Sequence, residues 1–187
     1  MALFVSKQAH CMYDLLAHYE AGDWNVEIPL IISNHPDLEH VAKKFNIPYY
    51  YFPITKENKE EQEAKEMALL KEYNITFSVL AKYMQIISPE FIKAYPNNII
   101  NIHHSLLPKH GGKGMYGDNV HKAVVENKET ESGITIHFLN ERFDEGEQIA
   151  QYKCEVLPTD TPDDVATKVH ALEYEWYQKV IEQVLLG

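Results

Sequence analysis

Short runs of β-branched and aromatic residues alternate with polar segments along the N-terminal half of the chain. These runs are Leu3–Ser6, Glu27–Ser33, Tyr49–Phe52, Thr76–Leu80 and Ile99–Ile102. Most of the segments between them carry apolar residues at helical spacing. The alternation predicts βαβ units, and therefore an α/β fold with a Rossmann-like, mostly parallel sheet and helices on both of its faces.

Helix signals support this interpretation. Apolar positions at helical spacing predict helices over 8–21, 37–45 and 59–73. Ser88-Pro89-Glu90 combines an N-cap residue, a proline at the first helical position and an acidic residue in the first turn, so a short helix is expected to begin there. Thr161-Pro162-Asp163-Asp164 is a similar signal and predicts the start of a closing helix.

The pattern changes after position 102. Residues 103–113 contain Pro108 and the paired glycines Gly111-Gly112, and Gly114 and Gly117 follow, which predicts a loop long enough to be functional. Strand-like runs return at Gly133–Leu139 and Gln148–Val156, with a polar stretch between them. We interpret these two runs as an antiparallel, hairpin-like addition to the sheet.

Composition and charge narrow the class of protein. The chain has 187 residues, 17 Lys and Arg against 28 Asp and Glu, and a formal net charge of -11. This length predicts a single domain over residues 1–187. The acidic balance disfavours nucleic acid as a partner. No apolar run is long enough for a membrane span, so we expect a cytoplasmic protein that does not bind membranes.

Candidate chemistry gathers at the end of the strand expected at 99–102. Asn101 and His103 alternate there and share one face, at the strand end where parallel sheets bind ligands. An amide and an imidazole can both donate to an oxygen that gains negative charge, and a carboxylate such as Asp144 can orient the ring. This combination suits acyl transfer. The alternative stays open that the Asn-x-His pair only satisfies backbone groups at the strand end.

The ten histidines raise the separate question of a metal site. The chain has no His-Glu-x-x-His motif and no paired Cys/His spacing. The neighbours His103 and His104 are expected to point to opposite faces of a strand. Because acyl transfer by the residues above requires no metal, we expect none to be bound.

The longer pattern around these residues points to a known family. Asn101-Ile102-His103-His104-Ser105-Leu106-Leu107-Pro108, followed at a distance by Asp144-Glu145-Gly146, resembles the formyltransferase and hydrolase family that uses 10-formyltetrahydrofolate. The resemblance covers essentially the whole chain, including Ala81-Lys82-Tyr83-Met84-Gln85-Ile86-Ile87-Ser88 and the closing helix. It implies the formyltransferase fold and an enzyme of one-carbon metabolism and purine biosynthesis.

The resemblance also implies roles for individual residues. Asn101 and His103 match the family residues that stabilise the oxyanion at the formyl carbon, and Asp144 matches the one that supports the histidine and relays protons. The positions that match those around the pterin ring of the folate are Met84, Ile86, Ile87, Asn140 and Phe143.

Two branches of the family are represented in the sequence. Up to Ser105 the chain resembles formyltetrahydrofolate deformylases, which hydrolyse 10-formyltetrahydrofolate to tetrahydrofolate and formate. From Leu106 onward, for example at Glu131-Ser132-Gly133-Ile134-Thr135, it is more similar to glycinamide ribonucleotide transformylases, which transfer the formyl group to an amine. Deformylases of this family usually carry an N-terminal ACT domain, which we do not expect within these 187 residues.

The loop after the first strand favours one branch. Transformylases of the family hold the phosphate of their substrate with a glycine-rich turn, and Lys7-Gln8-Ala9-His10 contains no glycine. Lys7 and His10, together with Glu173 on the closing helix, are our candidates for binding the acceptor. We therefore expect hydrolysis of 10-formyltetrahydrofolate, with transfer to glycinamide ribonucleotide as the alternative. The expected partners are therefore the folate substrate and, in the alternative, glycinamide ribonucleotide. Association into a homo-oligomer is left as an open alternative.

Overall fold

The computed structural model describes residues 1–22, 24–112, 114–142 and 144–187. Contacts divide the chain into two compact units, Met1–Ile100 and Asn101–Gly187. The seven strands have the order β3-β2-β1-β4-β5-β6-β7. The expected α/β class with a mostly parallel sheet is confirmed, while the expectation of a single domain stays a prediction. No helix among the described residues has the length and apolar character needed to cross a membrane.

The first unit contains a parallel set of strands. They are β1 (Ala2–Val5), β2 (Leu30–Ser33), β3 (Tyr49–Tyr51) and β4 (Ser78–Ala81). β1 lies between β2 and β4, and all three pairings of this set are parallel. Every residue of β1, β2 and β4 is buried, as expected for strands covered on both faces.

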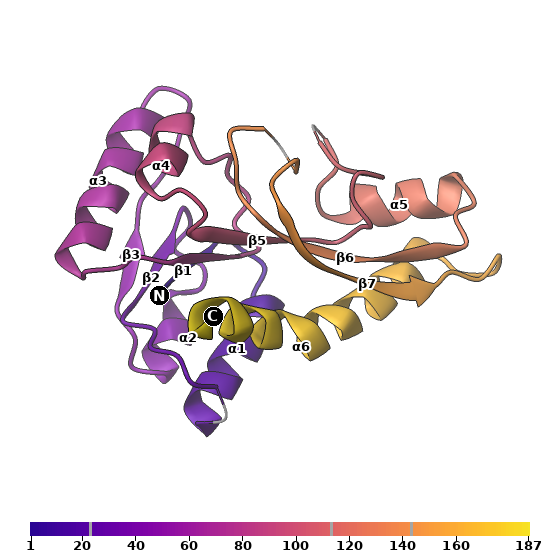
Figure 1. Cartoon of the computed structure of the whole chain (residues 1–187), viewed down its shortest axis with the longest axis horizontal. Helices are drawn as coiled ribbons and strands as arrows, with labels where there is room; N and C mark the ends of the chain where they lie inside the picture. The colour runs from indigo at the N-terminus through magenta and orange to yellow at the C-terminus, as the bar shows by residue number, and fades with distance from the viewer. Residues whose placement is uncertain (23, 113, 143) are drawn as a thin grey trace. The chain divides into compact units, whose positions relative to one another are not determined.

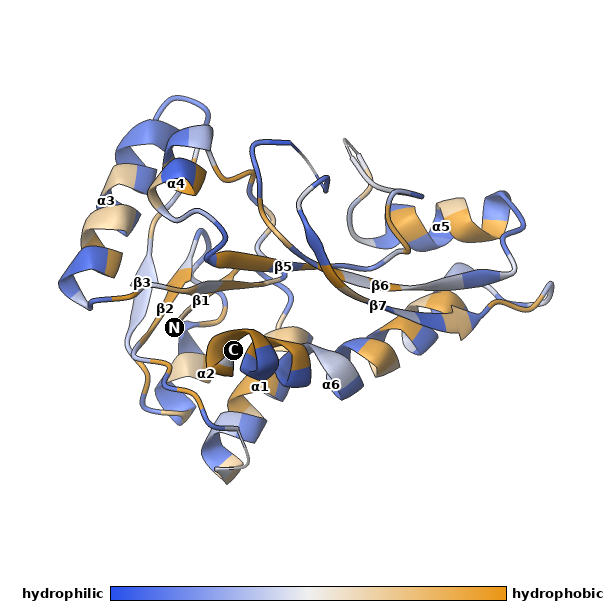
Figure 2. Ribbon diagram, in the orientation of Figure 1, coloured by the Kyte–Doolittle hydropathy of each residue, from blue (hydrophilic) through white to orange (hydrophobic). Residues whose placement is uncertain are grey.

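Four helices cover this set of strands. They are α1 (His10–Ala21), α2 (Glu39–Lys44), α3 (Lys59–Glu72) and α4 (Pro89–Ala94). In Figure 1, α1 and α2 lie on one side of the strands, and α3 and α4 lie on the other. Figure 2 shows hydrophobic residues concentrated on the strands and a largely hydrophilic α3. Ser88 caps α4 as predicted, because its Oγ accepts a hydrogen bond from the backbone N–H of Phe91 at 3.2 Å.

The second unit is built on an antiparallel hairpin. β5 (Ile99–His103) leads into it, and β6 (Glu131–Phe138) pairs antiparallel with β7 (Gln148–Glu155), which confirms the expected hairpin. The register shifts between Ile136 and His137. Such an irregularity re-aims the side chains beside it.

Two helices complete this unit. α6 (Pro162–Leu186) contacts β6, β7 and α5 (Asp118–Glu126). Thr161 caps α6 with a reciprocal capping box, in which each of Thr161 and Asp164 accepts a hydrogen bond from the backbone N–H of the other. The sequence predicted this cap but did not predict α5. The helix is short, follows a glycine-rich segment and buries only Val120, His121 and Val124, so its apolar pattern was too weak to recognise.

Candidate active site

The three candidate catalytic residues lie in the second unit. Asn101 and His103 occupy alternate positions on β5, and Asp144 lies in the connection between β6 and β7. His103 is 6% exposed and Asn101 is half-buried. Asp144 Oδ1 lies 3.7 Å from His103 Nδ1, which is a charge contact rather than a hydrogen bond. The structure therefore brings an amide, an imidazole and a carboxylate to one place.

A fourth residue, His137 on β6, joins this group and was not predicted. Its side chain is fully buried, and its Nδ1 lies 3.0 Å from the carbonyl oxygen of Phe138. A carbonyl only accepts hydrogen bonds, so Nδ1 carries a proton. Nε2 lies 3.2 Å from the Asn101 amide nitrogen and 3.9 Å from Asp144 Oδ1.

The environment of His137 favours its neutral form. Burial lowers the pKa of this ring, and the hydrogen bond to Phe138 and the charge of Asp144 oppose that shift. In the neutral ring with a proton on Nδ1, Nε2 is an acceptor, so the Asn101 amide donates to it. His137 thus fixes the orientation of the amide and leaves the second N–H of Asn101 for another acceptor.

The ring of His103 is held from both sides. Its Nε2 donates to the backbone carbonyl of His110 at 2.9 Å, which directs Nδ1 toward Asp144. An imidazole nitrogen and a carboxylate oxygen that face each other in this way can pass a proton between them once they approach to hydrogen-bond distance.

Asp144 is held in a backbone conformation that few non-glycine residues adopt. Its φ is 52°, and its Oδ2 accepts a hydrogen bond from the backbone N–H of Gly112 at 2.9 Å. Oδ1 is then directed to the two histidines. A Cβ added at Gly111 would lie 2.6 Å from the end of the Leu107 side chain and 3.5 Å from Asp144 Cβ, so a larger residue there requires Leu107 to move.

The connection between β6 and β7 contains Asn140, one of the predicted folate-binding residues. Asn140 spans the turn, because its Nδ2 donates to the carbonyl of Glu145 at 3.0 Å and its Oδ1 accepts from the backbone N–H of Arg142 at 2.9 Å. These hydrogen bonds stabilise the conformation of the turn, and a contact between Asn140 and folate stays a prediction. Phe143 lies outside the described residues.

The other predicted folate-binding residues lie in the first unit, after β4. Met84 and Ile86 are 40% and 56% exposed, whereas Ile87 is buried. The backbone N–H of Met84 donates to Ser6 Oγ at 2.8 Å, and Ser6 Oγ donates to Asn34 Oδ1 at 2.6 Å. Exposed apolar side chains on a braced segment suit a flat ring such as a pterin. The side chain of Ile87 is turned into the core and offers little surface to a ligand.

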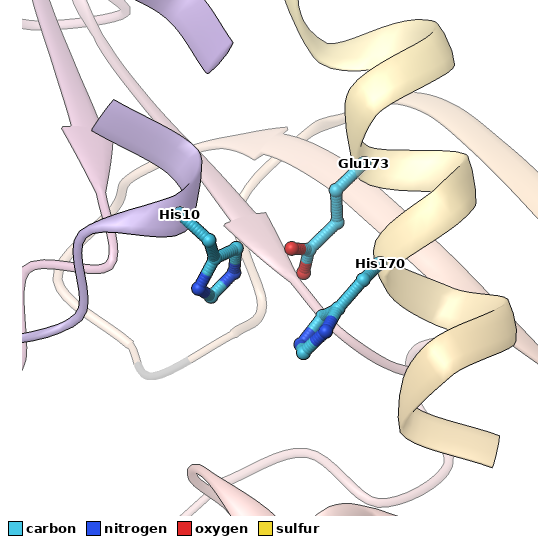
Figure 3. Close-up of side chains that lie close together, drawn as sticks. All are labelled: His10, His170 and Glu173. Carbon is cyan, nitrogen blue, oxygen red and sulfur yellow. The ribbon is translucent and has the colours of Figure 1, made fainter. Parts of the chain in front are cut away.

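The candidate acceptor-binding residues are placed separately in the two units. Lys7 is exposed and His10 begins α1 in the first unit. Glu173 is buried on α6 in the second, one turn from His170. Figure 3 shows the side chains of His170 and Glu173 leaving the same face of that helix, and their potential ligand atoms lie within 4.8 Å of each other. The roles of Lys7, His10 and Glu173 stay predictions.

One sequence-based expectation about the histidines is wrong. His103 and His104 do not point to opposite faces, because their rings are stacked with centroids 5.3 Å apart and planes 10° apart. β5 ends at His103, so the alternation of a strand no longer applies to the next residue. His104 also contacts the ring of His121 on α5, with centroids 5.3 Å apart.

Comparison with known proteins agrees with this geometry. A family model described as formyl transferase matches residues 1–181. A formyltetrahydrofolate deformylase from Synechocystis sp. is 47% identical over 173 residues, which make up 92% of this chain and 59% of that protein. A chloroplastic phosphoribosylglycinamide formyltransferase from Arabidopsis thaliana is 35% identical over 185 residues, covering 97% of this chain and 63% of that protein.

Solved structures give the same result. The crystal structure of a formyltetrahydrofolate deformylase from Pseudomonas syringae matches with a TM-score of 0.89 at 29% sequence identity, over 97% of this chain and 59% of that one. The chain spans less than two thirds of the length of each of these three proteins. Because the family model matches nearly the whole sequence, the chain belongs to the formyl transferase family.

Proposed function

We propose that this chain hydrolyses 10-formyltetrahydrofolate to tetrahydrofolate and formate. The observation that carries the proposal is the grouping of Asn101, His103, His137 and Asp144, which offers hydrogen-bond donors and a proton relay around one point. The 47% identity to a deformylase and the loop Lys7–His10, which lacks a glycine turn for phosphate, favour water as the acceptor.

The chemistry follows from these groups. Water adds to the formyl carbon while Asp144 takes its proton, and the second N–H of Asn101 donates to the oxyanion that forms. The carbon–nitrogen bond then breaks, and the proton that Asp144 took, with His103 Nδ1 beside it, passes to the departing folate nitrogen. The adduct thus collapses to formic acid, which loses its proton to become formate, so the reaction releases one proton.

Transfer to glycinamide ribonucleotide is the second candidate. The likeness of the C-terminal half to transformylases and the 35% identity to the Arabidopsis protein favour it. In this case an amine replaces water, and Lys7, His10 and Glu173 would bind the ribonucleotide. The cytoplasmic location, the absence of a metal and any homo-oligomer stay predictions in either case.

The test is the release of tetrahydrofolate from 10-formyltetrahydrofolate, with and without glycinamide ribonucleotide. We expect turnover without the ribonucleotide and one formate for each tetrahydrofolate. Turnover only with the ribonucleotide would establish transfer instead. Asp144→Asn should lower kcat by about a hundredfold or more, the usual contribution of a positioned proton carrier.

The neighbouring variant Glu145→Gln is the matched control, because this side chain is exposed and pairs with Arg142 at 3.5 Å. We expect it to keep full activity. Equal activity of Asp144→Asn and the unmodified protein would show that the proton relay is assigned to the wrong residue.

A further inference from the structure

The carbonyl that holds the His103 ring belongs to a loop in an unusual conformation. His110, whose carbonyl accepts from His103 Nε2 at 2.9 Å, has a φ of 53°. A non-glycine residue keeps such a conformation only where its surroundings enforce it. The position of this carbonyl therefore depends on what fixes residues 105–112.

A single carboxylate reaches both residues at the turn of this loop. Glu129 Oε2 lies 2.9 Å from Lys109 Nζ, and Glu129 Oε1 lies 3.4 Å from His110 Nε2. Within the loop, Ser105 Oγ donates to the carbonyl of Lys109 at 2.7 Å. The side chain of Lys109 lowers the pKa of Glu129 through a hydrogen bond and its charge, with a smaller contribution from His110, so the carboxylate is charged at neutral pH.

Glu129 is itself anchored. It follows α5 directly, and its backbone N–H donates to the carbonyl of Val124, a buried residue of that helix, at 3.1 Å. Its side chain is 22% exposed, whereas that of Lys109 is 65% exposed. In the contact between Glu129 and Lys109, the Glu129 carboxylate is therefore the fixed partner, and it holds the loop that carries Lys109.

Packing alone does not immobilise the loop. A cavity of about 240 Å³ lies against it, lined by Lys109, His110 and Glu129 together with Ser132, Glu131 and Lys153 among others. The loop has space to shift into this cavity if the charge contacts are removed. Glu131 lines the same cavity and pairs with Lys153 at 2.9 Å; its charge acts on Lys109 more weakly than that of Glu129.

We propose that Glu129 is a positioning residue for the catalytic imidazole of His103. By holding Lys109 and His110, Glu129 fixes the position of the His110 carbonyl. That carbonyl accepts a hydrogen bond from His103 Nε2 and so directs Nδ1 toward Asp144. This inference rests on the proposed role of His103 in formyl chemistry. Glu129 touches no reacting group, so its removal should slow the chemical step and leave folate affinity unchanged.

The experiment compares Glu129→Ala with the matched control Glu131→Ala in the full chain. For Glu129→Ala we expect kcat to fall about tenfold with KM unchanged, less than the hundredfold that a 1 Å displacement of a catalytic group can cost. Glu129→Gln keeps an acceptor for Lys109 and should recover part of this loss. Glu131→Ala should match the unmodified protein.

A second readout separates positioning from stability. In protein labelled with ¹⁵N-histidine, the imidazole signals of His103 report which ring nitrogen carries the proton, and we expect Glu129→Ala alone to mix the two tautomers. A lower melting temperature with kcat and the His103 signals unchanged would overturn the proposal, as would an equal loss in Glu131→Ala. If the unmodified protein shows no turnover, the proposed function fails, and the His103 signals still test the positioning.

Discussion

Glu66 on α3 should make the stability of the protein depend on pH. Its side chain has no exposed surface, and the Tyr83 hydroxyl donates to its Oε1 at 3.3 Å. Its Oε2 has no hydrogen-bond partner among the described residues. Burial raises the pKa of Glu66 to about 8; Glu63 adds to the shift, whereas the Tyr83 hydrogen bond and the charge of Lys59 oppose it.

The size and sign of the effect follow from linkage. The ordinary pKa is 4.5 and the value in the folded protein is about 8. At 1.36 kcal/mol per pH unit, ionisation of Glu66 costs the folded state roughly 4–5 kcal/mol, as an order of magnitude. Because the folded state holds a proton that the unfolded state releases, the free energy of unfolding falls as pH rises from 4.5 to 8 and is constant with respect to this group outside that window.

Glu66→Gln tests this reasoning, since the amide has a similar shape and does not ionise. Urea unfolding at pH 5, 7 and 9 should show that the stability of the variant relative to the unmodified protein increases at each step. Any cost of the new amide N–H groups is independent of pH and shifts all three points equally. Glu60→Gln is the control, because Glu60 is exposed on the same helix. A relative stability of Glu66→Gln that is the same at all three pH values would refute the reasoning.

Three further predictions concern the second unit. Thr161→Ala removes the side-chain half of the α6 capping box and should lower the free energy of unfolding by about 1 kcal/mol in urea titrations. Gly146→Ala places a Cβ 1.6 Å from the carbonyl oxygen of Phe138, so the turn must shift and turnover should fall steeply; activity equal to that of the unmodified protein would contradict this. His137→Phe removes the acceptor that orients Asn101, so kcat should fall at least tenfold, as when a catalytic donor is misplaced, with a KM within twofold of the original in steady-state assays.

The core of the first unit was predictable because its strands are buried on both faces. Such strands are short, continuous apolar runs, as in Leu3-Phe4-Val5, and their shortness together with β-branched and aromatic residues identifies them. The start of β2 was less clear: the apolar run from Glu27 includes Pro29, which has no backbone N–H, and the strand begins only at Leu30.

Two residues of the site were predictable from a strand rule, whereas Asp144 was assigned through the family resemblance. Asn101 and His103 share a face because they alternate on β5, and the sequence places them together. His137 gave no such signal, because a histidine between apolar neighbours such as Ile136 and Phe138 in a strand is usually a packed core residue. The bond between Lys109 and Glu129 joins residues 20 positions apart through a loop conformation that no pattern encodes.

The choice between water and an amine must be made outside the catalytic group. Both reactions pass through a tetrahedral adduct on the same formyl carbon, and both require an oxyanion donor and a proton relay. Asn101, His103, His137 and Asp144 would serve either reaction equally. Discrimination therefore depends on whether the acceptor is held, and holding a ribonucleotide requires a phosphate site. Because Lys7–His10 contains no glycine, backbone N–H groups there approach an anion less closely, which is why water is the acceptor that we favour.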